Sequence, residues 1–233
     1  MRFARLRGVT VDLHRVPGHV AIVGEGVDRS ALADVVEGAL EIGLRWLTVE
    51  VVSATRWSDP VCAASDAFAA AEQLVCAGRG GFHARGVRVR ALGRREARVP
   101  ARLQQVLAET EAMTAANHGM TLTLAIDHDG RLELAEAMAA IAEEVRAGAR
   151  RVSSIDEDAV AAKLTAPDLP DPDLIVRTAG DTATADFLVW QSAYSEFVFT
   201  DVGWPAFDRG DLFDAVAEYQ RRERRFGAVE PLQ

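Results

Sequence analysis

The chain has 233 residues, of which 49% are hydrophobic, and this is ample apolar material for the core of one α/β domain. Its formal net charge of −9 argues against a nucleic-acid-binding protein, because such binding needs a basic face. The two cysteines, Cys62 and Cys76, fit neither a metal pair nor a disulfide framework, and no apolar run approaches the ~18 residues of a membrane span. We therefore expect a cytoplasmic protein with a single domain over residues 1–233, in which residues 1–13 form a loose N-terminal segment.

The predicted elements alternate between strands and helices along the chain. The apolar residues 19–23 predict a buried strand that ends at Gly24 and Gly26, and residues 31–42 predict a helix with Asp28 or Ser30 as its N-cap. Further along the chain, the same patterns predict strand 47–52, helix 61–75, strand 87–92, helix 102–117, strand 120–126, helix 132–147, strands 173–176 and 196–199, and helix 211–226.

Strands that alternate with helices of this length indicate an α/β fold with a mostly parallel, six-stranded sheet and helices on both faces. In such sheets ligands bind beyond the carboxyl ends of the strands. We therefore expect a substrate cleft where four strand-end loops converge, at residues 24–29, 53–59, 127–131 and 177–181.

The loop after the first predicted strand reads GEGVDR. Two glycines between a strand and a helix let backbone N–H groups approach an anion, and Arg29 could add a bidentate phosphate contact. Glu25 could hold a divalent metal. The spacing alone equally allows an ordinary strand-to-helix turn with a capped helix.

The loop at residues 127–131 contains Asp127, His128 and Asp129. These residue types could ligate a metal, but an Asp- and Gly-rich loop before a helix is also common in proteins without one.

Three segments together resemble the cis-prenyltransferase, or undecaprenyl diphosphate synthase, family. They are HVAIVGEGVDRSA at residues 19–31, RTAGD at residues 177–181, and WQSAYSEFVFTDVGWP at residues 190–205. The resemblance implies an enzyme, a prenyltransferase that condenses isopentenyl diphosphate with an allylic prenyl diphosphate and uses Mg²⁺.

The resemblance also assigns roles to charged residues. Glu25 stands where the family has its catalytic Asp, and Glu196 matches the Glu that helps to hold Mg²⁺. Arg29 would bind the allylic diphosphate and Arg177 the diphosphate of isopentenyl diphosphate. An ion pair between Arg177 and Glu196 with a purely structural role is the alternative interpretation of these two residues.

The remaining assigned residues follow from the same motifs. A further segment that resembles the family is VVSATRWSDP at residues 51–60, and from it Ser53 joins the catalytic set. The residues that would contact substrate besides Arg177 are Gly26, Trp57, Gly180 and Asp181.

The sequence also departs from the family pattern. Ala183 stands in place of a second phosphate-binding Arg, and about one helix that follows Arg29 in the family is missing. These changes leave two other hypotheses open, a catalytically impaired partner subunit of a heteromeric prenyltransferase or an isoprenoid diphosphate-binding protein. The family implies a homodimer or a heterodimer with a homologous subunit, and a lipidic product would bring peripheral contact with a membrane. The sequence does not set the product length.

Overall fold

The computed structural model describes residues 3–24, 26–54, 64–93, 98–182, 186–204 and 206–222, with residues 64 and 65 described by their backbone alone. Its centre is a six-stranded parallel sheet with the strand order β5-β6-β4-β3-β7-β8. The strands are β3 (His19–Val23), β4 (Trp46–Ser53), β5 (Arg88–Leu92), β6 (Thr121–His128), β7 (Leu174–Arg177) and β8 (Glu196–Phe199). The predicted sheet is confirmed, and each strand lies within two residues of its predicted position.

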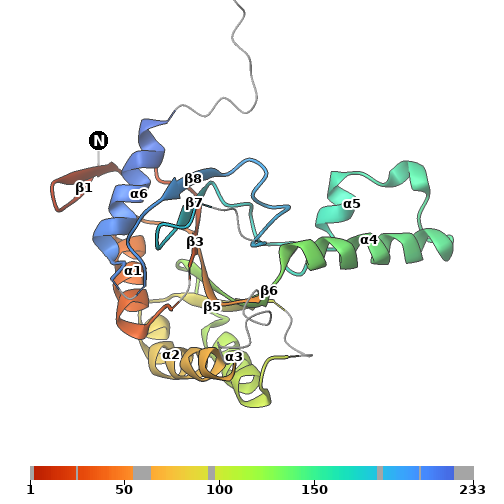
Figure 1. The fold of residues 1–233 in the computed structure, drawn as a ribbon, viewed down its shortest axis with the longest axis horizontal. Coiled ribbons are helices and arrows are strands. Elements are labelled where there is room, and N and C mark those ends of the chain that lie inside the picture. The colour runs from red at the N-terminus through yellow and green to blue at the C-terminus, as the bar shows by residue number, and fades with distance from the viewer. Residues whose placement is uncertain are drawn as a thin grey trace, which may run out of the picture.

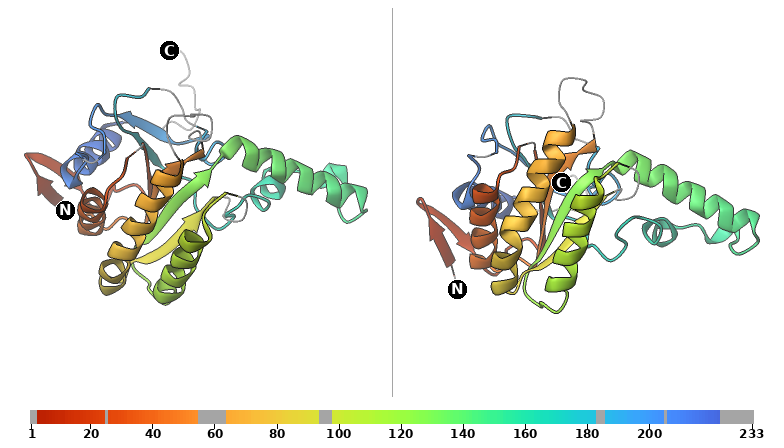
Figure 2. Two further views of the ribbon diagram at one scale, coloured as in Figure 1. Left: turned by 60° about the horizontal axis from the view of Figure 1, so that its bottom comes forward. Right: turned by 90° about the horizontal axis from the view of Figure 1, so that it is seen from below.

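Four helices pack side by side on one face of the sheet (Figures 1 and 2). They are α1 (Arg29–Glu41), α2 (Ala64–Ala84), α3 (Ala101–Thr114) and α6 (Arg209–Arg221). The main core lies between them and the sheet, because the apolar residues of each helix recur at helical spacing and those of each strand on alternate positions.

The other face of the sheet differs from the expectation of helices on both faces. It carries a smaller apolar cluster, in which Phe187 and Leu188 pack against Ala21, Ala125 and Ile175 of the strands. Helix α4 (Gly130–Arg146) instead extends away from the sheet, with the short helix α5 (Glu157–Ala161) beside it (Figures 1 and 2).

The N-terminal segment also differs from the prediction. It is an antiparallel hairpin of β1 (Phe3–Leu6) and β2 (Val9–Asp12), not a loose extension. Val11 is fully buried, and Asp12 exchanges two hydrogen bonds with the side chain of Gln220 on α6, 3.0 and 2.8 Å long. The hairpin is therefore anchored to the last described helix.

A buried histidine lies at the amino edge of the sheet. His19 begins β3, its Nδ1 lies 2.6 Å from the carbonyl oxygen of Pro170, and its Nε2 lies 2.8 Å from Oγ1 of Thr48. Burial is the main reason that the pKa of His19 falls from 6.5 to about 4. The imidazole is consequently neutral at pH 7 and holds the segment before β7 to the sheet.

Within the described residues, none of the helices has the length and apolar character needed to cross a membrane.

Candidate active site

The carboxyl edge of the sheet brings together residues that are far apart in the sequence. Val23 pairs with Arg177 at the ends of β3 and β7, and Ser53 pairs with His128 at the ends of β4 and β6. The four loops predicted to converge therefore do start at one edge, as parallel strands require.

The loop between β3 and α1 is shaped by its two glycines. A Cβ at Gly24 would lie 1.8 Å from Oγ1 of Thr178, so only glycine fits there, and Gly26 has a φ of +79° that favours glycine. Asp28 caps α1 by accepting hydrogen bonds from the backbone N–H groups of Ser30 and Ala31, at 2.7 and 2.9 Å. Glu25 lies outside the described residues.

Arg29 is the first residue of α1, and its side chain is exposed at the carboxyl edge. Its position at a helix N-terminus adds the positive end of the helix dipole to the guanidinium charge. An anion bound by the loop would meet both.

The segment after β7 places a buried cation beside this loop. Arg177 is 6% exposed and forms an ion pair with Asp181, and its Nε has no hydrogen-bond partner. The N–H of Thr178 donates to the carbonyl oxygen of Val23, which ties this segment to the end of β3. An unpaired buried N–H is costly, and an anionic ligand would satisfy it.

The backbone after Arg177 turns sharply. Ala179 and Gly180 both have positive φ, +62° and +69°, and their N–H groups donate to the carbonyl oxygens of Val202 and Thr200, at 3.0 and 2.9 Å. Non-glycine residues rarely adopt such values, and they cluster at functional sites. The turn fixes Asp181 next to the guanidinium of Arg177.

Ser53 ends β4 and is buried where the pairing with β6 shifts register. A register shift of this kind re-aims a side chain at the end of a strand. Trp57, the other residue predicted from this motif, lies outside the described residues.

Glu196 does not lie with these residues within one chain. It pairs with Leu174 at the start of β7, whereas Arg177 pairs with Phe199, so Glu196 lies three residues away along the strands, or about 10 Å. The carboxylate of Glu196 accepts a hydrogen bond from Nη1 of Arg222 at 3.0 Å. The alternative of a structural Arg177–Glu196 ion pair is therefore wrong, because each residue has a different partner.

The loop at residues 127–131 has a structural role in this chain. Asp129 is the N-cap of α4 and accepts hydrogen bonds from the N–H groups of Arg131 and Leu132, at 3.1 and 3.0 Å. Over the ranges that the structure describes, no group of three or more His, Cys, Asp or Glu residues could hold a metal ion. The capped-helix interpretation of this loop is the one that the structure supports.

Sequence reasoning missed a buried polar network behind this loop. Glu133 accepts hydrogen bonds from the N–H of Thr165 and from Nε2 of Gln191, at 2.8 and 3.3 Å, and lies 3.9 Å from Nε2 of His128. Burial lowers the pKa of His128, although the nearby Glu133 opposes the shift. The network holds the start of α4 to the segment that covers the second face of the sheet.

Sequence reasoning also missed a groove of about 440 Å³ between α1 and α2. Its apolar lining comes from Leu32 and Val36 of α1 and from Leu74 and Phe82 of α2, and Arg29 lines it as well. The residues of this groove lie up to 56 positions apart in the chain, so no local pattern reveals it.

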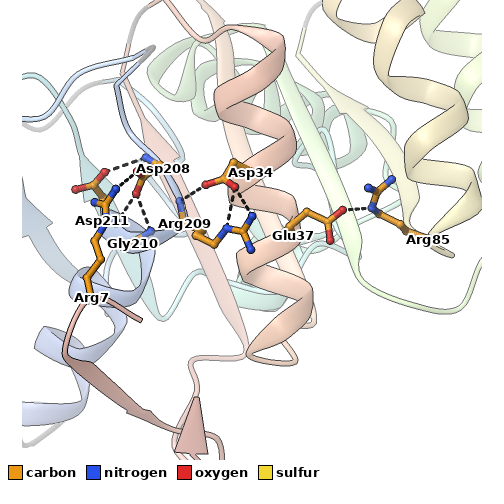
Figure 3. Close-up of polar contacts among 8 residues, drawn as sticks. All are labelled: Arg7, Asp34, Glu37, Arg85, Asp208, Arg209, Gly210 and Asp211. Carbon is orange, nitrogen blue, oxygen red and sulfur yellow. Dashed lines mark hydrogen bonds and ion pairs between the residues drawn. The ribbon is translucent and has the colours of Figure 1, made fainter. Parts of the chain in front are cut away.

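Ion pairs hold α1 in place on its other side (Figure 3). Asp34 accepts hydrogen bonds from the backbone N–H and from Nε of Arg209, at 2.9 and 2.8 Å, and Asp208 pairs with Arg7 of the hairpin. Burial alone would raise the pKa of Asp34, but the hydrogen bonds from Arg209 lower it. Helix α1 is thereby fixed to α6, and the groove between α1 and α2 has one firmly anchored wall.

The comparisons with known proteins agree with this architecture. The family model described as "Putative undecaprenyl diphosphate synthase" matches residues 2–227. The chain belongs to this family. It is 37% identical to Isoprenyl transferase 2 of Bradyrhizobium diazoefficiens, over 94% of this chain and 93% of that protein.

The chain is also similar to a second relative, from Thermobifida fusca. That protein is the (2Z,6E)-farnesyl diphosphate-specific trans,polycis-polyprenyl diphosphate synthase, and it is 39% identical over 99% of this chain and 78% of its own length. Among solved structures, lavandulyl diphosphate synthase of Lavandula x intermedia, in complex with dimethylallyl diphosphate, is similar with a TM-score of 0.85 and 26% identity. That similarity covers 92% of this chain and 100% of the other. The prenyltransferase activity and the cis-prenyltransferase fold that the sequence predicted are confirmed.

Proposed function

We propose that this prenyltransferase condenses isopentenyl diphosphate with an allylic prenyl diphosphate at the carboxyl edge of its sheet. One observation carries the proposal: two cationic segments start side by side at this edge. One is the β3–α1 loop with Arg29, and the other is the end of β7 with Arg177. The hydrogen bond from the N–H of Thr178 to the carbonyl oxygen of Val23 joins them. Two diphosphates need two such segments in one cleft.

Each diphosphate has a site in this proposal. The allylic diphosphate lies against Gly26 and Arg29, both of which are exposed, and the guanidinium charge and the helix dipole favour an anion there. The diphosphate of isopentenyl diphosphate binds Arg177, whose free Nε gains a partner, and Gly180 lets the backbone approach. Asp181 contributes by orienting the guanidinium.

The chemistry is an alkyl transfer in which the protein mainly stabilises charge. The bond between the allylic carbon and its diphosphate oxygen breaks, and pyrophosphate leaves with the electron pair. The terminal alkene carbon of isopentenyl diphosphate forms a bond to the allylic carbon, which leaves the positive charge on the internal alkene carbon. The CH₂ group next to that carbon then loses a proton to an oxygen of the departing pyrophosphate, and the C–H electron pair forms the new double bond. Arg29 balances the charge of the leaving pyrophosphate. Ser53, at the end of β4, belongs to the proposed catalytic set, and Trp57 stays an assigned substrate contact outside the described residues.

Mg²⁺ belongs to the proposal, but the residues described in one chain do not form its site. Glu196 lies at the other edge with Arg222, and no cluster of three ligands is present in the described part of the chain. Glu25 is the remaining assigned ligand, with the diphosphate oxygens completing the set. When bound, the ion would neutralise the departing pyrophosphate.

The groove between α1 and α2 is the place that we propose for the hydrocarbon tail of the allylic substrate. It begins at Arg29, where the diphosphate would bind, and its floor is apolar. Burial of a tail there is favourable by about 0.8 kcal/mol for each CH₂ group that leaves water.

Assembly as a dimer is also proposed. Tyr194 is 72% exposed just before the edge strand β8, Phe199 is 46% exposed within it, and Met138 on the projecting α4 is 58% exposed. Exposed large apolar side chains at the edge strand, such as Tyr194 and Phe199, and on a projecting helix, such as Met138, are typical of surfaces that a second subunit covers. The partner would be a second copy or a homologue, and the cytoplasm with peripheral membrane contact remains the location that we expect.

The test is incorporation of labelled isopentenyl diphosphate by the purified chain, with dimethylallyl, geranyl or farnesyl diphosphate as the starter and with Mg²⁺ or EDTA. We expect Mg²⁺-dependent product, near-complete loss of turnover in Glu25→Gln, and retained or higher turnover in Glu25→Asp. A folded chain that makes no product alone, but activates a co-purified homologue, would contradict the proposal in favour of a partner subunit.

A further inference from the structure

An ion pair bridges α1 and α2 at one end of the groove. Glu37 and Arg85 both line the groove, and their side chains point toward each other across it (Figure 3). Arg29 lies eight residues before Glu37 on the same helix, which is about 12 Å along the axis. The groove therefore extends from a cationic end at the carboxyl edge of the sheet, at Arg29, to the Glu37–Arg85 ion pair.

The position of Arg85 is fixed by more than Glu37. Its Nη1 also donates to the carbonyl oxygen of Gly81 at 3.2 Å. A Cβ at Gly81 would lie 3.2 Å from this nitrogen, and a Cβ at Gly78 would lie 2.7 Å from the ring of Phe82. Glycine weakens a helix interior, so its presence at both positions is explained by the space that Arg85 and Phe82 need.

The ion pair is a poor surface for an alkyl chain. The floor that precedes it is apolar, with Leu32, Val36 and Phe82 each at most 5% exposed. Asp34, a carboxylate that lines the groove between Arg29 and Glu37, is paired with Arg209. An alkyl tail gains free energy as its own CH₂ groups leave water and contact this floor. A tail that reached Glu37 and Arg85 would remove water from two charged groups that are 36% and 47% exposed, which is unfavourable.

We propose that the Glu37–Arg85 ion pair closes the groove and sets the maximum length of the isoprenoid tail, and hence of the product. The inference rests on the proposed function, and it adds the length of the product, which the proposed function does not set. A span of about 12 Å between Arg29 and Glu37 holds a tail of only a few isoprene units, so the product is short.

Variants of the pair should fold. Both side chains are partly exposed, and exposed ion pairs contribute little to stability. A matched control exists on the same helix, because Arg79 of α2 pairs with Glu109 of α3 at 3.1 Å with similar exposure but outside the groove.

The first test measures product length by mass spectrometry for the wild type, Arg85→Ala, Glu37→Ala and the control Arg79→Ala. We expect products longer by one or more isoprene units in the first two variants and wild-type products in the control. The exchange Glu37→Arg with Arg85→Glu should restore the wild-type length. Unchanged lengths in Arg85→Ala and Glu37→Ala, with turnover retained, would overturn the inference and leave the proposed function standing.

A second test needs no turnover. Calorimetry would measure the affinity of each protein for allylic diphosphates of increasing tail length. In the wild type the affinity should rise and then level off. In Arg85→Ala it should rise by about tenfold or more for the first isoprene unit beyond that length. Ala33→Phe, halfway along the groove, should move the levelling to a shorter tail. If Arg85→Ala and Ala33→Phe both follow the wild-type length profile, the ion pair does not limit the tail.

Discussion

Replacing Arg177 by Gln tests the anion site at the end of β7. The variant removes a guanidinium that is 6% exposed and whose Nε has no partner. A hydrogen bond from a charged donor contributes about 1.5–3 kcal/mol to binding. Each loss of about 1.4 kcal/mol lowers the affinity about tenfold. We therefore expect kcat/KM for isopentenyl diphosphate to fall by about 10- to 100-fold, mainly through KM, while KM for the allylic substrate changes little.

The matched control is Asp181→Asn, which removes the ion pair but keeps the guanidinium of Arg177. Steady-state kinetics with each substrate varied in turn, and thermal unfolding of each variant, separate binding from folding. Asp181 is 52% exposed, so its carboxylate can rehydrate when Arg177 is lost and the fold should persist. An unchanged KM in Arg177→Gln, or an equal loss in Asp181→Asn, would refute direct contact between Arg177 and the diphosphate.

Two further predictions concern stability. The pKa of His19 is about 4 in the folded protein and 6.5 ordinarily, so as pH falls the unfolded state binds the proton first. The free energy of unfolding should therefore drop by about 3 kcal/mol between pH 6.5 and 4. Denaturant titrations of the wild type and His19→Gln check this, and an equally steep fall in the variant would contradict it. His128, whose pKa burial also lowers, adds a fall of the same sign in both proteins. Gly24→Ala should lower the free energy of unfolding by about 1–3 kcal/mol, since its Cβ would overlap Thr178. The double variant Gly24→Ala with Thr178→Ala should recover part of that loss. Equal unfolding midpoints for the wild type and both variants would show that the contact at Gly24 is not tight.

The parallel strands and the loops that follow them were predictable, because apolar runs such as residues 19–23 end at glycines and alternate with helical patterns. The hairpin of β1 and β2 was missed because each strand has only four residues, too few for a clear alternating pattern, and because it is anchored by Gln220, which lies far along the chain. Helix α2 continues to Ala84, well past the predicted end at residue 75, because its glycines do not end the helix. Two of them, Gly78 and Gly81, make room for Phe82 and Arg85.

The candidate site shows a different limit. Glu196 was assigned by resemblance, although its place at the start of a parallel strand already puts it at the edge opposite to Arg177. The groove was beyond sequence reasoning, because Glu37 and Arg85 are 48 residues apart and meet only when two helices pack side by side.

The central claim is most directly tested by the stoichiometry and structure of the product that the purified chain makes from an allylic diphosphate, isopentenyl diphosphate and Mg²⁺. The account predicts one pyrophosphate released for each isopentenyl unit consumed, and a new double bond of cis geometry by NMR. Pyrophosphate release without a new carbon–carbon bond, or a product with a trans double bond, would contradict it.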